Sequence, residues 1–112
     1  MNIEDISKIN LQRCLRWHPK GLESWSLADW AVAFAGEAGE LCNVVKKLNR
    51  ERDGLSGNKE SMTELQIALW KEVADCYLYL DLFAQAARMD LSSAIRAKFN
   101  EVSIRNGFPE RL

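Results

Sequence analysis

The stretch Gly36-Glu37-Ala38-Gly39-Glu40-Leu41 places two acids three residues apart inside an apolar run. Positions three apart lie on one side of an α-helix, one turn removed, so both carboxylates share a face. A second pair with the same spacing, Glu72-Val73-Ala74-Asp75, follows in an equally apolar part of the sequence. The two stretches predict two central helices, each with a pair of carboxylates near the core.

Four such carboxylates on neighbouring helices would repel one another, and a divalent cation is the simplest compensation. Ligand sets made only of oxygen suit Mg²⁺, Mn²⁺ or Ca²⁺. Di-iron bundles place a histidine three residues after a glutamate on two helices, whereas Glu40 and Asp75 stand at those positions here. We therefore expect a redox-inert metal site formed by Glu37, Glu40, Glu72 and Asp75. Either pair by itself would more often be a solvated helix face.

Hydrophobic periodicity and capping residues predict helices over about 3–17, from Ser26 or Asp29 to about Arg50, over about 61–88, and over about 92–104. The segment between His18 and Ser26 contains proline and glycine and is predicted to be a loop. No segment alternates as a strand would. The sequence predicts an all-α fold, a four-helix bundle in a single domain over residues 1–112.

The third predicted helix is apolar on more than one face from Ile67 to Ala87. A helix that is apolar nearly all round is buried nearly all round, and a chain of 112 residues cannot easily surround it alone. We therefore expect an oligomer, a homodimer or a homotetramer. Trp70 on this helix is expected to be a core residue.

The composition narrows the choice of partners. A net charge of −1 argues against non-specific binding of nucleic acid. No apolar run reaches the roughly 18 residues that would span a membrane, and the polar start does not resemble a signal peptide. Cys14, Cys42 and Cys76 have neither disulfide nor metal-knuckle spacing, so we interpret them as reduced core thiols of a cytoplasmic protein.

The two acid pairs, with Lys71 before the second and Tyr79-Leu80 after it, resemble the MazG-type nucleotide pyrophosphohydrolases, near the dCTP pyrophosphatase branch of the all-α NTP pyrophosphatase superfamily. The resemblance covers about residues 17–112. It implies a MazG-like fold and an Mg²⁺-dependent cleavage of a (deoxy)nucleoside triphosphate to the monophosphate and pyrophosphate, as nucleotide-pool house-cleaning. By position, it implies that Glu37, Glu40, Glu72 and Asp75 are the metal ligands and the catalytic acids.

The resemblance also implies substrate contacts. His18, in Trp17-His18-Pro19-Lys20, would touch the base or sugar, and Lys98 would face the phosphates. The other candidate substrate residues are Trp25, Trp30, Tyr79, Asn100 and Arg105. Aromatic side chains can stack on any base, although a core position is the alternative for Trp30.

Two further hypotheses stay open. The chain could be a non-catalytic helical module whose acidic clusters serve ion pairs or protein docking. It could also keep the same fold and act on phosphoribosyl-ATP.

Overall fold

The computed structural model describes residues 1–112, and all regular elements are helical, which confirms the predicted all-α class. In chain order these are α1 (Ile3–Trp17), the short 3₁₀ helix η1 (Gly21–Ser24), α2 (Leu27–Arg52), α3 (Met62–Ala86) and α4 (Leu91–Arg105). Helix α1 has the predicted bounds, and η1 lies in a segment that was predicted to be a loop. None of these helices combines the length and the apolar character that crossing a membrane requires.

Side-chain caps explain where the helices begin. The Ser26 hydroxyl accepts a hydrogen bond from the Asp29 backbone N–H, and the Asp29 carboxylate accepts one from the Ser26 N–H. Such a reciprocal box satisfies two of the N–H groups that a helix start leaves without partners. Asn2 and Asp5 form the same box at α1, and Asp90 caps α4.

The chain divides into two compact units. We call residues Ser26–Leu80 the hairpin unit. We call the other unit, which combines Met1–Trp25 with Asp81–Leu112, the terminal unit.

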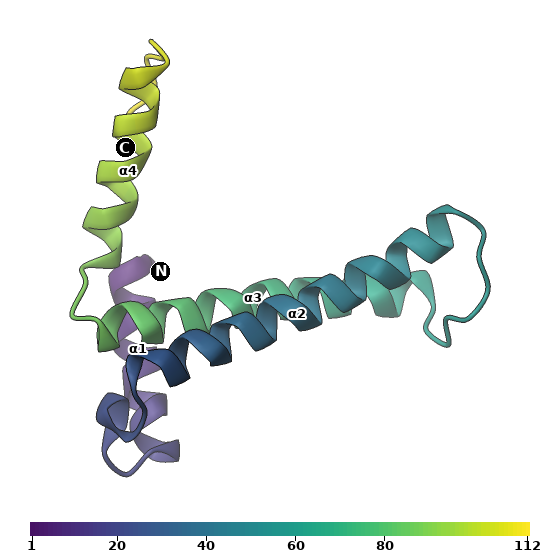
Figure 1. Ribbon diagram of the computed structural model, residues 1–112, viewed down its shortest axis with the longest axis horizontal. Coiled ribbons are helices and arrows are strands. Elements are labelled where there is room, and N and C mark those ends of the chain that lie inside the picture. Colours follow the sequence, from purple (N-terminus) through teal and green to yellow (C-terminus); the bar gives the residue numbers. More distant parts are fainter. The chain divides into compact units, whose positions relative to one another are not determined.

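In the hairpin unit, α2 and α3 run antiparallel side by side, joined by a loop (Figure 1). That loop is tied to α2 by a 2.6 Å ion pair between Lys47 and Glu60 and by Asn58, whose Nδ2 donates to the Lys47 carbonyl at 2.7 Å. Trp30 and Leu65 are the fully buried apolar side chains of this unit. Trp70, in contrast, is 64% exposed, so the prediction that it belongs to the core is wrong for the single chain.

The terminal unit is held by a buried polar network around Asp81. The Asp81 carboxylate is 0% exposed and accepts hydrogen bonds from Ser7 Oγ, Asn10 Nδ2 and Gln85 Nε2. Gln85 Nε2 also donates to the Ser7 carbonyl at 3.0 Å, so α1 is bound to the last turns of α3. Cys14 lies in the core of this unit as predicted.

Candidate functional site

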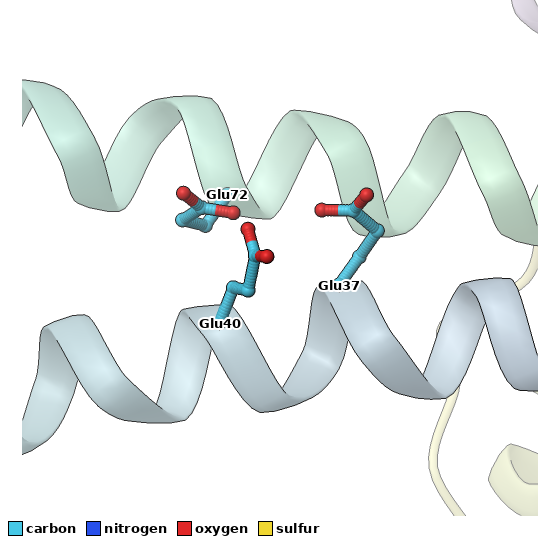
Figure 2. Close-up of side chains that lie close together, drawn as sticks. All are labelled: Glu37, Glu40 and Glu72. Carbon is cyan, nitrogen blue, oxygen red and sulfur yellow. The ribbon is translucent and has the colours of Figure 1, made fainter.

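Three of the four predicted acids meet between the two helices of the hairpin unit. Glu37 and Glu40 extend from α2, and Glu72 extends from α3 toward them (Figure 2). Each offers a carboxylate oxygen, and these oxygens lie within 4.8 Å of one another. The spacing of three residues puts both α2 acids on the face that meets α3.

The electrostatics of this cluster oppose full ionisation. Burial raises the pKa of Glu37, and the charges of Glu40, Asp75 and Glu72 add to the effect. Burial also raises the pKa of Glu72, followed by the charges of Glu40 and Asp75. Like charges at short range and partial desolvation both favour the protonated form. Cations are therefore attracted to this point of the hairpin unit.

The donor set fits a hard divalent cation. Glu72 Oε2 is buried and has no hydrogen-bond partner, which is costly for a carboxylate oxygen. None of the four predicted acids forms an ion pair with a lysine, arginine or histidine of the chain. The clusters therefore do not serve ion pairs within the chain. A cation bound by Glu37, Glu40 and Glu72 would satisfy the unpartnered oxygen and remove the repulsion.

Asp75 lies near the cluster without belonging to its converging oxygens. It is exposed on α3, one turn beyond Glu72. Its charge contributes to the raised pKa of Glu37, Glu72 and the neighbouring thiol of Cys76. Asp75 is therefore an outer carboxylate of the cluster, within electrostatic range of all three groups.

The structure brings two of the predicted substrate residues together. The ring of His18 meets the ring of Trp25 edge to face, with centroids 4.7 Å apart. His18 follows the last turn of α1 and is half-buried, whereas Trp25 follows η1 and is exposed. Both belong to the terminal unit, and the acids belong to the hairpin unit.

The structure corrects two of the other substrate predictions. Trp30 is 0% exposed, so its ring is a core residue and has no face for a base. Asn100 holds the end of the chain, because its Oδ1 accepts from the Leu112 N–H at 2.9 Å and its Nδ2 donates to the Leu112 carbonyl at 3.4 Å. The sequence predicts a substrate contact for this amide, but the amide forms a tertiary contact, which the spacing of residues does not reveal.

The side chains of the remaining candidates are exposed or half-buried. Tyr79 is half-buried on α3, one turn after Asp75. Lys98 is exposed on α4 and pairs with Glu101 at 2.8 Å. Arg105 is exposed in the last turn of α4.

The sequence did not predict the positions of two polar residues. Asp81 forms the buried network of the terminal unit, and its signal in the sequence was a single acid within the apolar run Leu78–Ala84 with a glutamine four residues later. Cys42 is exposed, so the interpretation of the cysteines as core thiols is wrong for this one.

Comparison of the chain with protein-family models, with curated proteins and with solved structures finds no match.

Proposed function

We propose that the chain is a MazG-type nucleoside triphosphate pyrophosphohydrolase that depends on Mg²⁺, with Mn²⁺ as a possible substitute. The observation that carries the proposal is the convergence of Glu37, Glu40 and Glu72 around a buried carboxylate oxygen that has no partner. Two acid pairs at a spacing of three residues on antiparallel helices also form the pattern by which the sequence resembles that family.

Within this proposal, Glu37, Glu40 and Glu72 hold the cation and Asp75 completes the negative field around it. The bound cation supplies Lewis-acid polarisation of the phosphate oxygens. A carboxylate oxygen that the cation does not use would accept a proton from the attacking water. Water then adds to phosphorus, the bond between the α- and β-phosphates breaks, and pyrophosphate leaves.

We keep the substrate contacts that the sequence predicts for side chains that are exposed or half-buried. His18 and Trp25 are proposed to contact the base or sugar, and Tyr79 to line the pocket. Lys98 and Arg105 are proposed to contact phosphate, Lys98 after exchanging Glu101 for the substrate.

We also propose that the protein works as a homodimer or homotetramer. On α3, Ile67, Trp70 and Val73 are 44%, 64% and 52% exposed, three large apolar side chains within two turns. Large apolar side chains grouped in this way on a surface commonly mark an interface. The apolar second face of α3 would then be buried by another copy.

Pyrophosphate release from a panel of nucleotides, phosphoribosyl-ATP included, tests the activity in the presence of Mg²⁺ and of chelator. We expect turnover of at least one nucleoside triphosphate with Mg²⁺ and none with chelator. Glu40→Gln and Asp75→Asn should lower kcat by at least about a hundredfold, because each weakens the cation site. Glu23→Gln, an exposed acid of η1, is the matched control and should keep full activity.

The non-catalytic module makes the opposite prediction. If the chain is a non-catalytic module, no nucleotide should be turned over, and the addition of chelator should leave the helical structure unchanged. Wild-type activity in both Glu40→Gln and Asp75→Asn would also contradict the proposed site. Calorimetric titration with Mn²⁺ separates the two parts of the proposal, because it reports cation binding without any nucleotide.

A further inference from the structure

The terminal unit contains a groove between α4 and residues 107–112, which follow α4 and which we call the tail. The groove has a volume of about 810 Å³, and its apolar lining consists of Ile95, Phe99, Val102 and Phe108. Sites for small molecules in proteins measure about 300–1,000 Å³ and combine mostly apolar walls with a few polar groups. The groove therefore has the size and the composition of a small-molecule site.

Hydrogen bonds hold the tail against α4. The Phe108 N–H donates to the Ser103 carbonyl at 2.9 Å, and Arg111 Nη1 donates to the Phe108 carbonyl at 2.7 Å. Asn100 binds Leu112 through both polar atoms of its amide, so the C-terminus lies beside the middle of α4 (Figure 1). Both walls of the groove are thus in place before anything binds, which reduces the loss of conformational freedom on binding.

Ser103 is the buried polar residue of the groove. It lines the groove and is 6% exposed, yet its hydroxyl forms no hydrogen bond within the chain. Buried polar groups in proteins almost always have a hydrogen-bond partner. A donor or acceptor on a ligand in the groove would provide this hydroxyl with the partner that the chain does not supply.

The charged residues of the lining do not extend the polar part of the groove inward. Lys98 and Glu110 are both exposed, and Lys98 already pairs with Glu101 at 2.8 Å. All other lining residues are uncharged. A charged group placed between the apolar walls would therefore lack a partner, which is costly.

We propose that the groove binds a small uncharged molecule that contains a flat aromatic ring and one hydrogen-bonding group. Phe99 on α4 and Phe108 on the tail are 42% and 55% exposed, so each wall presents an accessible aromatic side chain. Aromatic rings pair with one another by offset stacking or edge to face. The hydrogen-bonding group of the ligand pairs with the Ser103 hydroxyl.

The position of the tail favours a small molecule over a helix of a second copy. A packed helix needs an open apolar stripe along its neighbour, and the tail, held by Asn100 and Ser103, borders that stripe. Ile104 is the most exposed apolar side chain of α4, at 64%, and it does not line the groove. The groove is therefore confined between α4 and the tail.

Two-dimensional proton–nitrogen NMR of the full chain tests the proposal with three probes of one size: β-naphthol, β-methylnaphthalene and β-naphthoate. We expect β-naphthol to shift amide signals of residues 95–110 and to bind best. Its affinity should exceed that of β-methylnaphthalene by about threefold or more, because a methyl group cannot bond to Ser103. The charged β-naphthoate should bind most weakly.

Three variants locate the site. Phe99→Ala should weaken the binding of β-naphthol by about tenfold or more, because it removes one aromatic wall. Ile104→Ala, which removes an exposed apolar side chain of α4 outside the groove, is the matched control and should keep the binding. Ser103→Ala should abolish the preference for β-naphthol over β-methylnaphthalene and leave the binding of β-methylnaphthalene unchanged. Circular dichroism checks that every variant remains helical.

Several results would overturn the proposal. They are the absence of binding of all three probes up to their solubility limits, signal shifts that lie mainly outside residues 95–110, and equal losses in Phe99→Ala and Ile104→Ala. A preference for β-naphthol that persists in Ser103→Ala would also contradict it. If Phe99→Ala forms a smaller assembly than the wild type in size-exclusion chromatography, a second copy occupies the groove instead. No measurement involves a nucleoside triphosphate, so the outcome does not depend on the proposed activity.

Discussion

Glu37 and Glu72 are half-buried carboxyl groups whose pKa values are raised, first by burial and then by the neighbouring acids. A raised pKa in the folded state has a defined consequence for stability. The folded protein binds the proton of each group more tightly than the unfolded chain does, so the contribution of these two carboxyls to the free energy of unfolding is greatest at low pH. It decreases as the pH rises above the ordinary carboxyl value of 4.5.

This pH dependence of stability leads to a prediction for the variant Glu72→Gln. In chelator at neutral pH, the variant should unfold a few degrees above the wild type, because it removes one of the repelling charges. The difference should disappear below about pH 4, where the wild-type carboxyl is protonated as well. Thermal unfolding followed by circular dichroism at both pH values measures it, with Glu23→Gln as the control that should show no difference.

Added Mg²⁺ should reverse the order at neutral pH. The wild type should gain thermal stability, because a ligand that binds only the folded state stabilises it, whereas Glu72→Gln should gain less. An equal response of both proteins to Mg²⁺ would contradict a cation site at Glu72.

The buried network around Asp81 leads to a second prediction at the scale of single residues. Asp81→Ala would leave Ser7 Oγ, Asn10 Nδ2 and Gln85 Nε2 without their common acceptor inside the terminal unit. We expect a loss of about 2–4 kcal/mol in the free energy of unfolding, measured by urea denaturation. Glu101→Ala removes an exposed carboxylate instead and should cost less than about 1 kcal/mol. Equal effects of the two substitutions would show that the network adds nothing to stability.

At the scale of the elements, local sequence accounts for most of what forms. Helix α1 begins and ends where its caps and Pro19 predict, and α4 begins at the Asp90 cap. The 3₁₀ helix η1 is the exception, because a single turn of four residues has no periodicity to detect. Its Gly21 adopts a φ of +60°, a conformation that favours glycine.

Helix α2 contains two glycines for which the chain itself shows no packing reason. A Cβ built on Gly36 or Gly39 would have no heavy atom within 4 Å. Gly36→Ala should therefore stabilise the protein by about 1 kcal/mol, and Ala35→Gly at the neighbouring exposed position should destabilise it by a similar amount. Both are measured by thermal unfolding. If Gly36→Ala destabilises the protein instead, another copy or a ligand must pack against the glycine in solution.

At the scale of the whole molecule, the two units differ in what they bury. The terminal unit has its polar network, whereas the hairpin unit leaves the second face of α3 open at Ile67, Trp70 and Val73. If that face is an oligomer interface, Trp70→Glu should convert the wild-type oligomer to a monomer, because a buried charge without a partner is costly.

Size-exclusion chromatography with light scattering measures the result. Trp17→Glu places the same charge at an equally exposed tryptophan of α1 and should leave the oligomer intact. A wild-type protein that is already monomeric at micromolar concentration would contradict the interface. If the Trp70→Glu variant remains an oligomer, the interface lies on another surface of the chain.

The sequence by itself determined the helices and the carboxylate pairs, because caps, breakers and a spacing of three residues act within a few positions of the chain. It did not decide which apolar face of α3 is buried. Both faces of α3 carry large apolar side chains, so the sequence places Trp70 in the core, whereas the structure exposes it. On α2, the sequence left Trp30 open between the core and the substrate, and the structure buries it.

Only the tertiary structure decided that Glu37, Glu40 and Glu72 converge while Asp75 stands outside, and that Asn100 binds the end of the chain. The rotation of one helix against its neighbour sets these distances, and that rotation depends on contacts between residues far apart in the sequence. Periodicity shows on which face of its own helix a residue lies. It does not show which side chain of the neighbouring helix that residue contacts.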